Sequence, residues 1–148
     1  MFGDGGLCDE KFSQYYPGIP NRHYCYRIGN GFSPRGSVPA GHLEPGEDPL
    51  NGACREFEEE TGYFPRHIEK LGYYNQFPGV LRAATNLFFA TNLVQTSQHL
   101  EPGEVLETVH MPLNEVISMI INGNFIDGSL QLGVLLALQK GMLVFPTK

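Results

Sequence analysis

The segment 49–61 constrains this chain more than any other, because its pattern predicts a helix with well-defined ends. Asp48 suits the N-cap, Pro49 the first helical position, and Gly62 the left-handed residue that follows a helix. At about 100° per residue, small and apolar side chains fall on one stripe of this helix. The members of the stripe are Leu50, Ala53, Cys54, Phe57 and Thr61. We therefore expect a helix over 49–61 that buries this stripe.

Three carboxylates lie on a separate edge of the same helix, which we call the glutamate ridge: Glu56, Glu59 and Glu60. Their spacing of three and four residues makes them neighbours, with Arg55 as a nearby cation. Each like-charged pair at this spacing destabilises a helix by roughly 0.2–0.5 kcal/mol, and anions in the last turn also oppose the helix dipole. A Glu-rich run on its own is usually a solvated helix face. Repulsion this dense favours a site for a hard divalent cation held by oxygen ligands.

The ridge is part of a longer spaced motif. The motif starts at Gly41, reaches Glu47 after five residues, and continues after seven more as Arg55-Glu56-Phe57-Glu58-Glu59-Glu60-Thr61-Gly62-Tyr63. This pattern resembles the Nudix box, G-x5-E-x7-R-E-U-x-E-E-x-G-U with U apolar or aromatic, at all nine defined positions over 23 residues. Such agreement is far more specific than a lone Gly-rich loop. The chain therefore resembles the Nudix hydrolase family over roughly residues 38–140.

The resemblance implies an α/β fold, a Nudix-type α/β/α sandwich with a mixed β-sheet. It also implies that the ridge binds Mg²⁺ or Mn²⁺. The ligands implied are Glu56, Glu60, Glu59 as an additional ligand with a catalytic role, and the backbone carbonyl of Ala40. Arg55 is implied to act in catalysis by orienting this cluster together with Glu47. Carboxylate-held metal ions can offset the charge of a polyphosphate and activate water, so an acidic pocket can bind an acidic substrate.

Three segments are similar to the ADP-ribose pyrophosphatase branch of the family. These are Val38-Pro39-Ala40-Gly41, Pro78 at fifteen residues beyond Tyr63, and Gly123-Asn124-Phe125-Ile126-Asp127-Gly128. The branch implies a nucleotide-sugar substrate, with ADP-ribose or a related ADP-sugar split into AMP and a sugar phosphate. Pro78 is then expected to take part in substrate binding.

Two further residues have roles that only the resemblance implies. Glu104 ends an acidic turn just before a predicted strand, where this branch places its water-activating glutamate, so it is a candidate general base. Arg27 follows Tyr26 as in a branch segment whose arginine contacts substrate. A solvated turn acid and a surface arginine are the alternatives for the two residues.

The chain's composition narrows its partners and its location. It has 10 Lys and Arg against 16 Asp and Glu, a net charge of −6, which argues against binding nucleic acid by phosphate neutralisation. Three cysteines without a C-x-x-C motif are typical of reduced thiols, so we expect a cytoplasmic protein. The most apolar stretch, 132–145, is too short to cross a bilayer of about 30 Å, so we expect no membrane partner.

The organisation expected is a poorly patterned leader over 1–37, with one plausible strand at 23–28, and a Nudix hydrolase domain over 38–148. Further strands are expected at about 68–74, 86–93 and 105–111, and further helices at about 114–121 and 129–140. Other nucleoside diphosphate derivatives remain open as substrates. The leader also leaves open a nucleotide-binding domain that does not cleave its ligand, and a homodimer.

Overall fold

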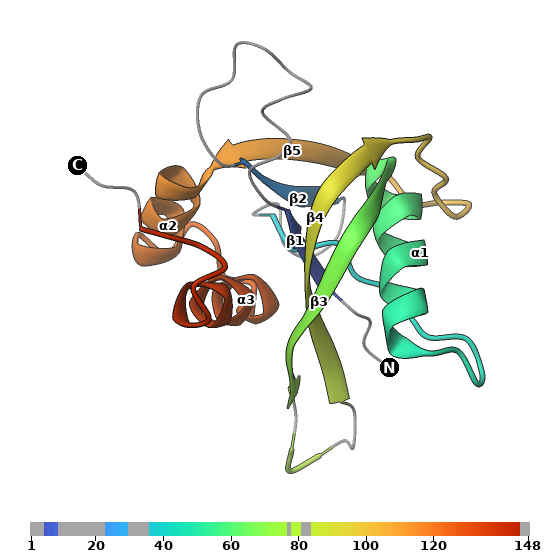
Figure 1. The fold of residues 1–148 in the computed structure, drawn as a ribbon, viewed down its shortest axis with the longest axis horizontal. Coiled ribbons are helices and arrows are strands. Elements are labelled where there is room, and N and C mark those ends of the chain that lie inside the picture. The colour runs from blue at the N-terminus through green and yellow to red at the C-terminus, as the bar shows by residue number, and fades with distance from the viewer. Residues whose placement is uncertain (1–4, 9–22, 30–35, 77, 81–83, 146–148) are drawn as a thin grey trace.

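The computed structural model describes residues 5–8, 23–29, 36–76, 78–80 and 84–145. Its strands and helices follow one another in a β-rich order that ends with two helices (Figure 1). They are β1 (Gly5–Cys8), β2 (His23–Gly29), α1 (Pro49–Thr61), β3 (Tyr63–Asn75), β4 (Ala84–Gln95), β5 (Leu106–Pro112), α2 (Leu113–Ile121) and α3 (Gly128–Gln139).

The described strands form two sheets. In the first, β4 lies between β1, which is parallel to it, and β3, which is antiparallel to it. In the second, β2 and β5 pair in antiparallel orientation. Figure 1 shows α1 on one side of these strands and α2 with α3 on the other. The predicted α/β sandwich with a mixed sheet is therefore confirmed.

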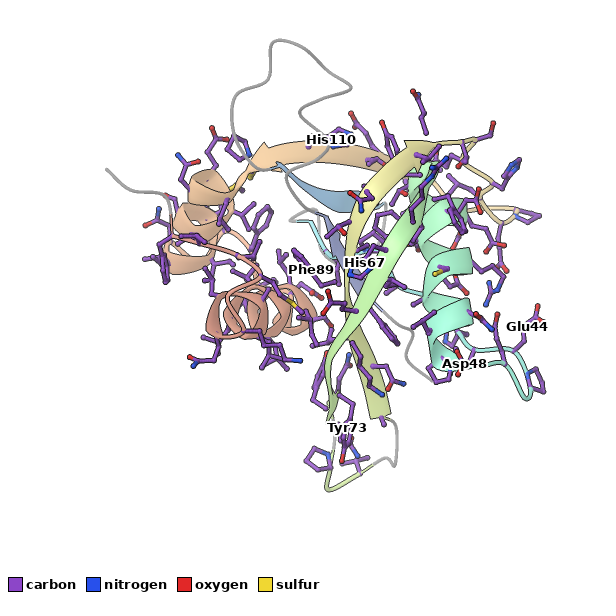
Figure 2. All side chains as sticks on the ribbon, viewed as in Figure 1. Glu44, Asp48, His67, Tyr73, Phe89 and His110 are labelled. Carbon is purple, nitrogen blue, oxygen red and sulfur yellow. The ribbon has the colours of Figure 1, made fainter. Side chains whose placement is uncertain are left out.

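The central strand β4 contributes to the core on both of its faces. Leu87 and Phe89 pack in the larger cluster, which includes residues of α2 and α3, and Figure 2 shows Phe89 on that side of the sheet. Ala90 and Leu93 pack with Phe57 of α1 in a second cluster. A strand covered on both faces reads as a continuous apolar run, which is why 87–90 contains no polar residue.

The helices cover the sheets and are short. α1 has 13 residues, α2 has 9 and α3 has 12. Across the described ranges, no helix combines the length and the apolar character needed to span a membrane.

The predicted elements are present, with shifted ends. The helix expected at 49–61 has these bounds, and the two later helices each begin one residue before the predicted start. β3 begins at Tyr63, five residues earlier than expected, because Gly62 at φ 73° turns the chain directly from α1 into a strand.

The first strand was not predicted. β1 contains Gly5 and Gly6, which have low strand propensity, yet it pairs with 87–90 of β4. The strand expected at 23–28 is β2. Both strands fall within the segment described above as a leader, so this segment adds a strand to each sheet. The boundary at residue 38 stays a prediction.

A long hairpin extends from the body of the fold. Its register runs from the pair Tyr63 and Gln95 at one end to the pair Asn75 and Ala84 at the other. Thirteen residues of β3 at about 3.3 Å each give a hairpin about 40 Å long. Its tip projects past the helices, with Tyr73 near the tip (Figures 1 and 2).

Candidate functional site

The helix α1 that carries the glutamate ridge is fixed at both ends by local interactions. Asp48 Oδ1 accepts hydrogen bonds from the N–H groups of Leu50, at 3.0 Å, and Asn51, at 3.3 Å. Figure 2 shows Asp48 where α1 begins. At the other end, the N–H of Gly62 donates to the carbonyl of Glu58 at 2.8 Å. These contacts satisfy backbone groups that the helix itself leaves unpaired, and they fix the residues at which α1 begins and ends.

Arg55 joins the ridge to the loop that precedes α1. Its Nε and Nη2 donate to the two carboxylate oxygens of Glu47, at 3.0 and 2.9 Å. Its Nη1 donates to Glu56 at 2.9 Å and to Glu59 at 3.1 Å. Nη2 also donates to the carbonyl of His42 at 2.9 Å. A planar guanidinium with five N–H groups can hold this many oxygens in fixed positions, which a lysine cannot.

The pairing of Arg55 with Glu47 changes the protonation equilibria of both side chains. Hydrogen bonds from Arg55, and then from the backbone N–H of Glu44, lower the pKa of Glu47 to about 2. The same pairing raises the pKa of Arg55 above its ordinary value, because Glu47 accepts from its charged form. Both groups are therefore fully ionised at neutral pH.

The backbone of residues 40–42 lies directly against the ridge. The Ala40 N–H donates to Glu60 Oε2 at 2.8 Å, and the His42 N–H donates to Glu56 Oε1 at 3.1 Å. A Cβ atom added to Gly41 would lie 1.8 Å from Glu56 Cδ, so only glycine allows this approach. Glu60 is 4% exposed. A carboxylate this buried loses most of its contact with water and depends on partners such as the Ala40 N–H.

Gly52 allows the loop at 43–47 to pack against α1. A Cβ atom at this position would lie 2.4 Å from Leu43 Cδ2 and 3.1 Å from Glu47 Oε2. Glycine in the middle of a helix costs about 1 kcal/mol relative to alanine, and here it makes room for the carboxylate that pairs with Arg55. The sequence analysis did not single out Gly52, although a glycine inside a strong helix pattern is a signal of close packing.

The donor chemistry of the cluster fits a hard divalent cation. Glu47, Glu56 and Glu59 share the positive charge of Arg55, so they carry excess negative charge even before Glu60 is counted. Carboxylate and carbonyl oxygens are the ligands that Mg²⁺ and Mn²⁺ prefer. Among the side chains that the structure describes, no three His, Cys, Asp or Glu are grouped to hold an ion as they stand. The carboxylates instead accept from Arg55 and from backbone N–H groups, which an ion would have to replace.

The remaining predicted residues lie apart from the ridge or outside the described residues. Glu104 is exposed in the turn between β4 and β5, and its Oε2 accepts from the Glu101 N–H at 3.1 Å. This turn lies near the C-terminal end of α1 (Figure 1). Pro78 is exposed in the connection at the opposite end of the hairpin. The side chain of Arg27 is outside the described part of the chain.

The structure thus brings one set of predicted residues together and leaves another dispersed. The residues at the ridge are Ala40, Arg55, Glu56, Glu59 and Glu60. The loop 96–105 that carries Glu104 contacts the backbone at the C-terminal end of α1, whereas Pro78 lies at the opposite end of the hairpin. A residue that the sequence analysis missed is Gln98, whose Nε2 donates to the carbonyl of Glu60 at 2.6 Å. The two residues are 38 apart in sequence, so no local pattern could have predicted the contact.

Comparison with known proteins decides the family. The family model described as the NUDIX domain matches residues 22–130. The chain belongs to the Nudix family. The motif from Gly41 to Tyr63, which contains the glutamate ridge, is therefore the Nudix box of this domain.

Several relatives of this Nudix domain are known. The chain is 32% identical over 104 residues to a CMP-5′-(N-acetyl-N-hydroxy-3-aminopropyl)phosphonate hydrolase of Streptomyces rubellomurinus, covering 70% of this chain and 50% of the relative. It is 32% identical over 85 residues to an ADP-ribose pyrophosphatase of Bacillus subtilis, covering 56% of this chain and 46% of the relative. The chain thus spans about half the length of these curated relatives.

A solved structure supports the fold. The crystal structure of an ADP compounds hydrolase matches with a TM-score of 0.72 at 18% identity, covering 94% of this chain and 74% of that chain. At this identity the likeness shows that the two chains share the Nudix fold.

Proposed function

We propose that this Nudix domain hydrolyses the pyrophosphate bond of ADP-ribose or a related ADP-sugar, giving AMP and a sugar phosphate, with Mg²⁺ or Mn²⁺ as cofactor. The observation that carries the proposal is the position of the ridge under the 40–42 backbone, where Glu60 is buried and bound to Ala40 and Glu56 is bound to His42. The relative from B. subtilis, an ADP-ribose pyrophosphatase, supports the choice of substrate.

The ion would be held by the ridge. Its ligands would be Glu56, Glu59, Glu60 and the carbonyl of Ala40. When bound, a divalent ion there supplies a Lewis acid for phosphate oxygens and lowers the pKa of coordinated water. Arg55 keeps Glu56 and Glu59 in place through the contacts described above, and it holds Glu47 against the same cluster.

The remaining proposed residues act on water and on the substrate. Water attacks one phosphorus of the pyrophosphate, the bridging P–O bond breaks, and the leaving phosphate keeps the electron pair. Glu104 takes the proton of the attacking water as general base. Arg27 binds a phosphate through its guanidinium. Pro78 lies at the opposite end of the β3–β4 hairpin from the ridge, so its part in the choice of substrate would be played away from the ion.

The test is an assay of product release. The protein is incubated with ADP-ribose and Mg²⁺, with EDTA as the metal-free condition, and AMP and ribose 5-phosphate are quantified by chromatography. We expect both products in equal amounts, none with EDTA, and at least a hundredfold loss of turnover in Glu60→Gln. The control is Glu115→Gln, which changes an exposed acid on α2, on the far side of the sheets from α1 (Figure 1). Absence of products from wild-type protein contradicts the proposal.

A second candidate is hydrolysis of another nucleoside diphosphate derivative. The specific observation is that the relative acting on a CMP-linked phosphonate matches more of this chain than the ADP-ribose pyrophosphatase does, 70% against 56%. A panel of ADP-sugars and cytidine and uridine derivatives separates the candidates. Calorimetry on the same panel detects binding without cleavage. Cytoplasmic location and a homodimer are also proposals, and size-exclusion chromatography tests the second.

A further inference from the structure

The C-terminal end of α1 is held by a distant part of the chain. The last carbonyls of an α-helix have no partner within the helix and are often left to water. Here four successive carbonyls, at residues 59–62, accept from the loop 96–105, which joins β4 to β5, and from the start of β5. The donors are the His99 N–H to Glu59 at 2.9 Å, Gln98 Nε2 to Glu60 at 2.6 Å, Thr108 Oγ1 to Thr61 at 3.4 Å and the Thr96 N–H to Gly62 at 2.7 Å.

Gln98 is the side chain that connects these parts. Besides the carbonyl of Glu60, its Nε2 donates to the carbonyl of Leu106 at 3.4 Å. Leu106 is the first residue of β5, so one amide nitrogen links the end of α1 to both ends of the segment 98–106. The two hydrogens of the amide allow both contacts at once.

The segment between Gln98 and Leu106, the two anchors of the loop, contains Glu104. The N–H of Glu104 donates to the carbonyl of Glu101 at 3.0 Å, and the N–H of Glu101 donates to Glu104 Oε2 at 3.1 Å, which closes a turn. The backbone of Gln98 packs tightly against the end of α1, because a Cβ atom on Gly62 would lie 3.1 Å from the Gln98 backbone nitrogen. The backbone that Gln98 and His99 hold belongs to Glu59 and Glu60, whose side chains form the ridge.

We propose that Gln98 is a positioning residue that holds the turn bearing Glu104 in a fixed relation to the glutamate ridge. The inference rests on the proposed function, in which Glu104 accepts the proton of the attacking water. Gln98 does not itself contact substrate. Its amide fixes the loop to the backbone of the residues that hold the ion.

A double-mutant cycle tests the positioning role. Gln98→Met keeps the length of the side chain and removes its donors. With ADP-ribose and Mg²⁺, we expect this change to lower kcat by about ten- to a hundredfold in the wild-type background, with KM changed less than about twofold. In the Glu104→Gln background we expect it to lower kcat by less than about twofold, since the two residues act together. Additive losses overturn the inference, and so does full activity of Glu104→Gln.

A matched control is available on the other side of the fold. Gln131 Nε2 also donates to a backbone carbonyl, that of Phe125, at 2.9 Å. Gln131→Met removes the same kind of hydrogen bond from α3, so we expect it to leave kcat unchanged. An equal loss of kcat in Gln98→Met and Gln131→Met would assign the effect to general destabilisation and overturn the inference.

Hydrogen–deuterium exchange separates this inference from the proposed function. We expect Gln98→Met to speed exchange of the amides in 96–104 by about tenfold or more and to leave 50–57 of α1 unchanged. If wild-type protein releases no AMP, the proposed function fails, and the exchange result still shows whether Gln98 holds the loop. Unchanged exchange in 96–104 overturns the inference whatever the activity.

Discussion

Replacement of Gly41 by alanine separates the function of the site from the stability of the fold. The added methyl group would lie 1.8 Å from Glu56 Cδ and about as close to both carboxylate oxygens, at 1.9 and 2.2 Å. These atoms are the far end of a flexible side chain, so Glu56 can rotate away while the backbone stays in place. The substitution therefore removes one carboxylate from the ridge without disturbing α1.

The cost in stability follows from the contacts that Glu56 loses. It gives up the hydrogen bond from the His42 N–H, at 3.1 Å, and the ion pair with Arg55, at 2.9 Å. Hydrogen bonds to charged groups contribute about 1.5–3 kcal/mol each when they are well shielded. Three effects offset this loss. Water hydrates the rotated Glu56 carboxylate, and repulsion among the ridge carboxylates falls. Alanine also lowers the conformational entropy of the unfolded chain, which stabilises the fold by about 0.4–1 kcal/mol. We expect a net loss of about 1 kcal/mol, which lowers Tm by about 2–4 °C.

The cost in turnover is larger. A reacting group misplaced by about 1 Å can reduce the rate a hundredfold, so we expect Gly41→Ala to lower kcat by about two orders of magnitude. The assay is AMP release from ADP-ribose with Mg²⁺, alongside thermal unfolding followed by circular dichroism. The control is Gly128→Ala at the start of α3, where an added Cβ meets nothing within 4 Å.

Two results would refute this reasoning. Wild-type turnover in Gly41→Ala would show that the position of Glu56 does not matter. Loss of the folded state would show that the alanine displaces backbone and not the end of a side chain. As a further check, Gly41→Ala should have little additional effect in the Glu56→Ala background, because the side chain that it displaces is already absent.

The remaining predictions concern the ridge and Arg55. Glu60→Gln should keep or raise Tm, because the amide oxygen can still accept from Ala40 while a buried charge is removed, and turnover should fall at least a hundredfold; equal activity contradicts the metal assignment. Mg²⁺ should raise Tm of the wild type progressively once its concentration exceeds its dissociation constant, and it should have a smaller effect on Glu56→Gln; equal shifts in both proteins would place the ion elsewhere. Hydrogen bonds from Arg55 lower the pKa of Glu47 to about 2, so the ionised carboxylate stabilises the fold at pH values above the ordinary pKa of glutamate. This contribution is lost as pH falls toward 2. Chemical denaturation should therefore show a shallower loss of stability between pH 5 and pH 2 in Glu47→Gln than in wild type, and parallel curves would exclude the Arg55 pairing as the cause.

Local sequence signals account for the parts of the fold that were predicted. The bounds of α1 follow from Asp48, which caps the first turn through its own side chain, and from Gly62, which adopts the left-handed conformation. Both devices act within a few residues of the helix. β1 could not be predicted in this way, because its glycines have low strand propensity. Its partner strand lies far along the chain, since Gly5 pairs with Leu87 of β4.

The same distinction holds at the site. The spacing of Glu56, Glu59 and Glu60 places them on one edge of any helix, so the ridge could be predicted from sequence. The contact of Gln98 with Glu60 depends on how β4 and β5 return to α1, which no spacing within either segment encodes. Pro78 was selected by its offset from Tyr63, and an offset along the chain does not reveal that the residue lies at the far end of a hairpin.

The capping of α1 by distant residues also leads to an expectation for the folding of this region. The first turn can acquire its partner as soon as Asp48 and Leu50 adopt their conformations, because they are only two residues apart in the chain. The carbonyl of Thr61 has its partner 47 residues further on, so this contact requires β5 to lie against the end of α1. We therefore expect the end of the helix that presents Glu59 and Glu60 to form later than its first turn, and its stability in the native state to depend on β5 and the loop 96–105 as well as on the helix.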